Sequence, residues 1–156
     1  MSPPRHQLMP VTDLRPAEYN PRRISEESMA GLSVSIERFG LVQPINWNQR
    51  TNRVVGGHRR LKALAARGVE QTEVIVVDLP ESEEKALNVA LNSPAIAGEF
   101  VPEDLDVLLT EIRQSVPELF DALLLEELAS NALREAFGLN GGQRTRTPSP
   151  SPGTPR

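Results

Sequence analysis

Apolar residues recur every three or four positions in an early stretch of the chain. Met29, Leu32, Ile36 and Phe39 would share one face of a helix. We therefore predict a helix over Glu26–Phe39, capped by the Ser that precedes it and ended by the Gly that follows it.

Short runs rich in β-branched residues predict the strands. The run EVIVVDL, residues 73–79, is apolar without alternation, and we expect it to be buried on both faces of a sheet. HQLMPV (6–11) is predicted as a first strand, and QPINWN (43–48) and RVV (53–55) as the arms of a hairpin. HRRLKALAAR (58–67) is predicted as a helix between this hairpin and the strand 73–79.

From Ser82 onward the pattern is helical only. SEEKALNVALN (82–92) has a Ser that can cap a helix, followed by acidic residues. PEDLDVLLTEIRQ (102–114) predicts another helix, and PELFDALLLEELASNALREAF (117–137) one or two more.

The order of elements predicts an α+β domain over residues 1–92 with a helical extension packed on it over 93–140. Residues 141–156 contain Pro, Ser, Thr and Arg but no aliphatic side chain, and are predicted to be disordered. Charge follows the same division. Residues 1–80 carry 11 Lys and Arg against 8 Asp and Glu, whereas residues 81–140 carry 3 against 13. An anion site is therefore expected in the first part.

Composition removes several classes of function. The chain has no Cys, which excludes disulfides, thiolate catalysis and Cys-based metal sites. Its two His exclude a multi-His metal site, and no metal ligand is assigned. No apolar run approaches the roughly 20 residues that span a membrane, and the N-terminal residues lack the apolar run of a secretory signal. These features fit a cytoplasmic protein.

The turn between the hairpin and the second helix concentrates basic chemistry. Gly56 and Gly57 are followed by His58, Arg59 and Arg60. Free N–H groups at a helix start, glycines that allow close approach, and two guanidiniums suit a phosphate. The spacing is neither that of a P-loop nor that of the dinucleotide fingerprint. Taken alone, this turn fits a phosphate site or an exposed basic helix start.

Three motifs in a fixed order identify a resemblance. NPRR (20–23), SIERFGLVQPI (35–45) and VVGGHRRLKA (54–63) together resemble the N-terminal domain of the ParB family of partition proteins, which shares a fold with sulfiredoxin. The resemblance covers about residues 8–92, and residues 86–109 are similar to the continuation in phage and mobile-element members. It implies a small mixed sheet with helices, followed by an all-helical C-terminal appendix.

The resemblance also implies a pocket for a nucleoside triphosphate, CTP or ATP, with Mg²⁺ as an optional companion. Carried over by position, the phosphate side would be Gly56, Gly57, His58, Arg59, Arg60 and Asn92, the nucleoside side Gly40, Gln43 and Pro44, and the closing loop Asn20, Arg22 and Arg23.

His58 is the main departure from the family pattern. The ParB family has at this position a Glu implicated in triphosphate hydrolysis, and sulfiredoxin has its catalytic Cys. The lack of Cys excludes sulfiredoxin chemistry. A neutral His can act as a base or hydrogen-bond a phosphate, so His58 is the candidate catalytic residue and enzymatic activity stays open.

We therefore expect a ParB-like nucleotide-binding module with a DNA-associated role in partition, maintenance or regulation of a mobile element or chromosome. One alternative is an enzyme on the same fold: a nucleotide hydrolase, phosphotransferase or nuclease. A nuclease would need carboxylates, and Glu18, Asp78 and Glu99 form no convincing cluster in the sequence. The other alternative is a DNA-binding adaptor that works without nucleotide through the basic first half.

The acidic extension argues against a DNA-reading helix in residues 93–140, because acidic side chains repel phosphates. Its leucine-rich face is expected to pack in a core, and it could also receive a protein partner or a second copy of the chain.

Overall fold

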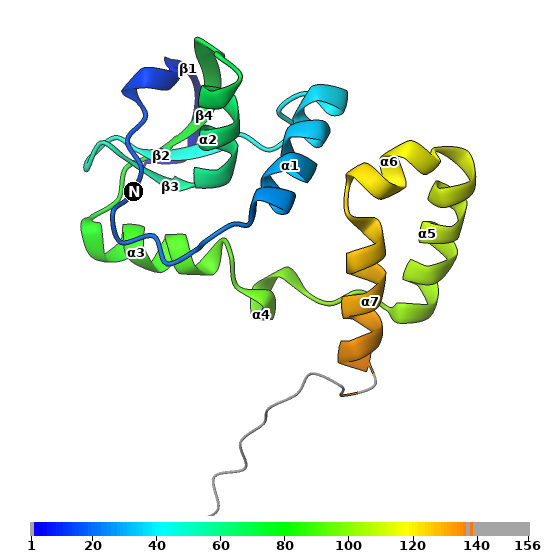
Figure 1. The fold of residues 1–156 in the computed structure, drawn as a ribbon. Coiled ribbons are helices and arrows are strands. Elements are labelled where there is room, and N and C mark those ends of the chain that lie inside the picture. Colours follow the sequence, from blue (N-terminus) through cyan, green and yellow to red (C-terminus); the bar gives the residue numbers. More distant parts are fainter. Residues whose placement is uncertain (1, 137, 139–156) are drawn as a thin grey trace, which may run out of the picture.

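The computed structural model describes residues 2–136 and residue 138. The predicted disorder of residues 141–156 lies outside this range. A four-stranded mixed sheet forms the centre of the first part (Figure 1). Its strands are β1 (Arg5–Pro10), β2 (Ile45–Asn48), β3 (Arg53–Gly56) and β4 (Gln71–Val77), in the spatial order β1-β4-β2-β3. β1 pairs antiparallel with β4, β4 parallel with β2, and β2 antiparallel with β3.

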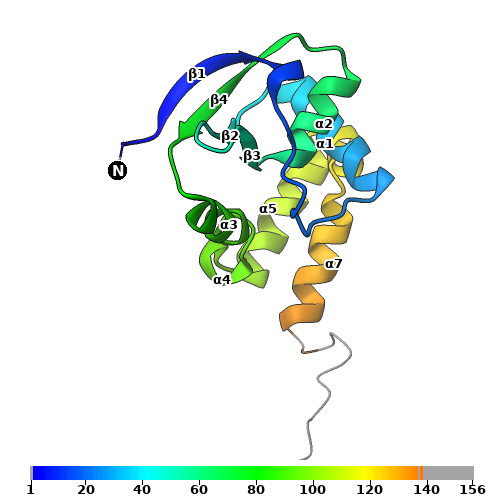
Figure 2. The ribbon, with the colours of Figure 1, turned by 90° about the vertical axis from the view of Figure 1, so that its left-hand side faces the viewer.

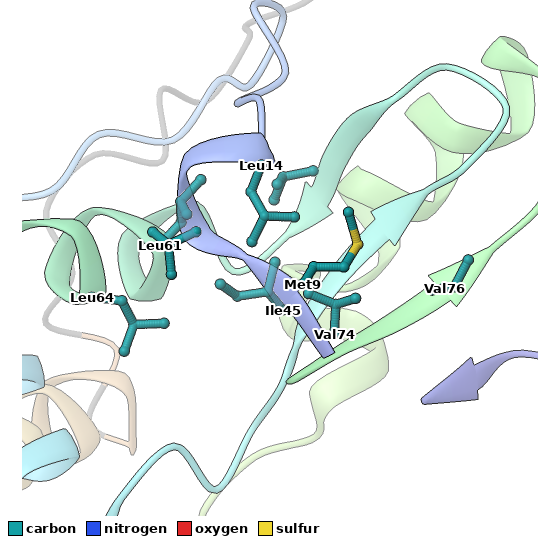
Figure 3. Close-up of a cluster of buried hydrophobic side chains, with 9 residues drawn as sticks. Met9, Leu14, Ile45, Leu61, Leu64, Val74 and Val76 are labelled. Atoms are coloured by element: carbon teal, nitrogen blue, oxygen red, sulfur yellow. The ribbon is translucent and has the colours of Figure 1, made fainter. Parts of the chain in front are cut away.

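One face of the sheet carries the main hydrophobic core. Figure 3 shows Leu61 and Leu64 of α2 (His58–Ala66) beside Ile45 and Val74 of the strands. All four side chains are buried, and the first two are one helical turn apart, so they reach the sheet together. The core therefore packs α2 against the start of β2 and the middle of β4.

A strand was predicted over residues 73–79, and β4 begins and ends two residues earlier; its expected burial on both faces was wrong. Thr72, Val74 and Val76 are buried, whereas Ile75 and Val77 are only half-buried. Helices α1 and α2 lie together on one side of the sheet (Figure 2). On the other side α3 (Glu81–Ala90) contacts β3, the edge strand farthest from β1.

Helix α1 (Glu26–Phe39) has the predicted bounds. The Ser25 side chain accepts a hydrogen bond from the Ser28 N–H, and Gly40 ends the helix with a φ of +77°. Its apolar face is less buried than the periodicity suggests, since Phe39 is 54% exposed. The short 3₁₀ turn η1 (Val11–Asp13) joins β1 to the irregular segment that leads into this helix.

The second part is helical, as predicted. It contains α4 (Pro94–Ala97), α5 (Pro102–Ser115), α6 (Pro117–Ala122) and α7 (Leu125–Ala136). The one-turn helix α4 was not predicted. The proposed Ser82 cap of α3 is wrong, because the helix begins at Glu81 with Pro80 as its N-cap. None of the helices in residues 2–136 is long and apolar enough to cross a lipid bilayer.

The helical extension builds a core of its own. Leu105, Leu109 and Phe120 are buried together, with apolar residues of α7 packed around them. Figure 1 shows α5, α6 and α7 gathered beside α1 and away from the sheet. The extension meets α1 at Gly31, where a Cβ atom would lie 3.4 Å from the carbonyl oxygen of Ala122. The leucine-rich face thus packs mainly within the extension.

Candidate anion-binding site

The site begins at the turn from β3 into α2. Gly57 has a φ of +90°, which a residue with a side chain rarely adopts, and it precedes the first helical residue. A Cβ there would lie 3.0 Å from Arg60 Nη2 and 3.2 Å from Ile45 Cγ1. Because the first intrahelical bond runs from Leu61 N to Gly57 O (2.9 Å), the preceding N–H groups have no partner within the helix. Such a helix start favours an anion.

Three arginines converge on this turn, and we call Arg22, Arg59 and Arg60 the arginine group. Burial, together with the charge of Arg22, lowers the pKa of Arg59. Burial, together with the charge of Arg59, lowers the pKa of Arg60. Within the described residues no carboxylate lies within ion-pair distance of any of the three. The positive charge of the group is therefore uncompensated.

Neutral amides hold two of these guanidiniums. Arg60 Nη1 donates to Gln43 Oε1 at 2.6 Å, and Arg22 donates to Asn92 Oδ1. Arg60 Nε is buried and has no hydrogen-bond partner among the described residues. The structure thus brings together one residue of the closing loop, one of the nucleoside side and several of the phosphate side. Among the described residues, their guanidiniums have no carboxylate partner.

The other predicted residues lie around this group in different ways. Asn20 Oδ1 is 3.5 Å from Asn88 Nδ2, which places the closing loop against α3. Gly56 is buried, and a Cβ on it would lie 2.7 Å from Leu91 Cδ1, so the end of α3 packs directly on the turn. The remaining predicted residues are less enclosed: Arg23 and Gly40 are exposed, Pro44 is half-buried, and a Cβ on Gly40 would meet nothing within 4 Å.

His58 has a structural partner. Its Nε2 atom accepts a hydrogen bond from the backbone N–H of Ala17 at 3.0 Å. Burial lowers the pKa of His58, so the imidazole is neutral at pH 7 with its proton on Nδ1. An Nε2 atom occupied in this way is not free to act as a general base, and this contact gives no support to the catalytic candidate.

The sequence analysis missed a buried polar network centred on Glu84, which we call the Glu84 network. The Glu84 side chain is fully buried. Its Oε2 atom accepts from Tyr19 Oη at 2.8 Å and from Arg53 Nη2 at 2.9 Å. Its Oε1 atom accepts from Asn48 Nδ2 at 3.0 Å and from the Thr51 hydroxyl.

The donors around Glu84 decide its charge. Burial by itself would raise the pKa of this carboxyl, but the hydrogen bonds from Thr51, Tyr19 and Asn48 and the charge of Arg53 lower it below its usual range. Burial and the hydrogen bond to Glu84 raise the pKa of Tyr19. Glu84 is therefore ionised and Tyr19 neutral at pH 7, which keeps the network intact.

A spacing of four residues was the signal that could have found this network. Glu84, Asn88 and Asn92 lie on one face of a helix and its continuation. Asn88 is buried and donates to the carbonyl oxygen of Val55 at 2.8 Å. Helix α3 turns this polar face toward the sheet and leaves Val89 61% exposed. The functional interpretation of Asn92 alone overlooked the two residues that fix its helix.

In residues 2–136 no three His, Asp or Glu side chains gather as metal ligands would. Asp78, one of the nuclease candidates, pairs with Arg50 at 2.8 Å on the surface.

Fold and site together define an α+β domain with a turn rich in glycine and arginine between an edge strand and a helix. The family described as the ParB N-terminal domain matches residues 4–94, and the chain belongs to this family. A probable chromosome-partitioning protein ParB of Helicobacter pylori is 32% identical over 124 residues, which are 76% of this chain and 40% of that protein. A nucleoid occlusion protein of Oceanobacillus iheyensis is 28% identical over 135 residues, which are 83% of this chain and 43% of that protein. The chain thus spans less than half the length of these curated relatives.

A solved structure supports the same fold. It is the C-terminally truncated chromosome-partitioning protein ParB of Caulobacter crescentus complexed with CTP-γ-S, with a TM-score of 0.58 and 22% identity. The similarity covers 72% of this chain and 64% of that chain. The predicted mixed sheet and the following helices are confirmed. The expected phage or mobile-element origin stays a prediction.

Proposed function

We propose that this chain binds a nucleoside triphosphate at the start of α2 and acts as a nucleotide-dependent module in a DNA-associated role, in partition, maintenance or regulation of a chromosome or mobile element. The observation that carries the proposal is the convergence of the arginine group without a carboxylate to neutralise it. Holding like charges together costs free energy, which a polyanion would recover.

The geometry favours a triphosphate over a single phosphate. The free N–H groups of α2 and the guanidiniums of Arg59 and Arg60 offer donors along a path that continues to Arg22 and Asn92. Gln43, one of the positions proposed for the nucleoside, accepts a hydrogen bond from Arg60 and directly precedes Pro44 in the chain. The phosphate and nucleoside sides are thus joined by one hydrogen bond.

CTP is the first candidate nucleotide, and ATP is the second. The Caulobacter structure with a similar fold contains CTP-γ-S, which supports this order. Within the described residues the arginine group has no carboxylate neighbour, so Mg²⁺ would arrive with the phosphates rather than on a protein carboxylate site.

Isothermal titration with CTP, ATP, GTP and UTP tests the proposal. We expect wild-type protein to bind CTP and Arg59→Ala to weaken binding by roughly 10- to 100-fold, since a charge-assisted hydrogen bond contributes about 1.5–3 kcal/mol. Arg67→Ala is the matched control, because Arg67 lies at the other end of α2 and is 3.7 Å from Glu37. No binding at millimolar concentrations, or equal affinity in the Arg59 and Arg67 variants, would reject the proposal.

The DNA-associated role needs its own test. We propose that nucleotide changes how the chain associates with DNA, and DNA retention at increasing salt, with and without CTP, measures this. Retention that ignores nucleotide would favour the adaptor alternative. The exposed acids of the extension support the expectation that DNA contacts the first part; they are Glu118, Asp121, Glu126, Glu127 and Glu135. We propose the helices of the extension as the surface that contacts a protein partner or a second copy of the chain.

A further inference from the structure

The loop that carries Arg22 is held by hydrogen bonds to the two neighbouring helices. Residues 15–23, the 15–23 loop, form no helix or strand and pass along α3 before α1 begins (Figure 1). Arg22 donates a hydrogen bond to Asn92, just beyond α3, and its charge helps to lower the pKa of Arg59. Like charges that are held close together need contacts elsewhere to keep them there.

Besides the contacts of Asn20 and Arg22 described above, two hydrogen bonds hold this loop, five and three residues before Arg22. The N–H of Ala17, a buried residue, donates to His58 Nε2 at the start of α2. The hydroxyl of Tyr19 donates to Glu84 Oε2 in α3. The loop is thus tied to both helices that border the anion-binding turn.

The surroundings of Tyr19 make its contact specific. Two cations lie over the Tyr19 ring, with Arg53 Cζ at 5.2 Å and Lys85 Nζ at 5.5 Å from the ring centroid. Removing the hydroxyl alone would leave the ring in this cation–π setting and cut only the bond to Glu84. The hydrogen bond of His58 can also be removed by itself, because among the described residues the imidazole forms a hydrogen bond only through Nε2.

We propose that His58 and Tyr19 are positioning residues that tie the 15–23 loop to α2 and α3 and so preset Arg22 at its contact with Asn92, beside the anion-binding turn. The consequence for nucleotide affinity rests on the proposed function, whereas the tie itself does not. In this chain the residue at the family's Glu position organises the site through a backbone amide. It need not touch the phosphates.

Limited trypsin digestion without nucleotide tests the tie. Trypsin can cut after Arg22 and Arg23, which are both exposed, while Pro16 protects the bond after Arg15. His58→Asn and Tyr19→Phe should each speed cleavage at Arg22 and Arg23 about three- to tenfold, because cleavage follows the population of the open loop. His58→Gln should stay at the wild-type rate, because the Gln amide oxygen reaches the position of Nε2 and the Asn oxygen does not.

Cleavage after Arg67, at the far end of α2, serves as the reference bond. If both variants leave the Arg22 and Arg23 rates unchanged, or speed cleavage after Arg67 equally, the proposal is overturned. Equal rates for His58→Gln and His58→Asn would also overturn the role of Nε2. Adding CTP separates the two proposals: faster loop cleavage in the variants without protection of wild type by CTP keeps the tie and rejects nucleotide binding.

Discussion

Glu84 should be the side chain whose charge contributes most to the stability of the first part. The perturbation is Glu84→Gln, which keeps size and one acceptor oxygen but removes the charge. Its carboxylate is fully buried and binds Arg53 at 2.9 Å. In the variant an amide N–H would face the donors of Tyr19 and Arg53.

The loss of stability in Glu84→Gln depends on how much of the Arg53 charge stays without a partner. Removing one partner of a buried ion pair costs about 3–5 kcal/mol. The Arg53 side chain is 21% exposed and also lies 3.2 Å from Glu81, so part of its charge stays compensated. We therefore expect the free energy of unfolding to fall by about 3 kcal/mol, at the lower end of that range.

Urea unfolding gives the measurement. The single Trp, Trp47, precedes Asn48 of the Glu84 network, so its fluorescence reports the unfolding of the first part of the chain. Glu83→Gln is the matched control on the same helix; its side chain is exposed, and its effect should stay within about 0.5 kcal/mol. A Glu84→Gln protein within 1 kcal/mol of wild type, as a rough threshold, would refute the reasoning.

Three further predictions concern the turn and its supports. Gly57→Ala should lower stability by about 1–2 kcal/mol in urea unfolding and weaken nucleotide binding, because a φ of +90° disfavours a side chain and the new Cβ would displace Arg60; unchanged affinity would contradict this. Asn88→Ala should cost about 1–3 kcal/mol in the same assay, since the carbonyl of Val55 loses its donor, and a neutral effect would contradict the bond. Burial lowers the pKa of His58, so the unfolded chain binds a proton at this residue more readily than the folded chain does. The stability that neutral His58 contributes should therefore be complete above pH 6.5 and should fall as pH drops through 6.5 toward the folded pKa. Comparing wild type with His58→Gln between pH 5 and 8 by thermal melting isolates that part, and parallel curves would contradict it.

Local elements could be predicted because their causes lie within a few residues. The bounds of Glu26–Phe39 follow from a capping Ser and a left-handed Gly, whose contacts reach three or four positions. The burial of β4 could not be predicted in the same way. Its apolar run does not say whether helices cover both faces, and here Ile75 stays half-buried.

In the candidate site, too, the local features could be predicted and the long-range contacts could not. The order of the motifs was enough to expect a phosphate-binding turn at Gly57, Arg59 and Arg60, because glycine, charge and a helix start are local properties. The contact of Arg22 with Asn92 joins residues 70 positions apart. The number of residues between two positions does not say whether their side chains meet in the folded chain.

The sequence by itself determined most of the helices and strands, the family, and the position of the basic turn after β3. Only the tertiary structure decided which partner each polar group has. It gave the imidazole of His58 to the backbone of Ala17, and it buried Glu84 among the donors of Tyr19 and Arg53. A buried polar group is stable only where partners meet it, and the packing of distant segments, rather than their order, supplies those partners.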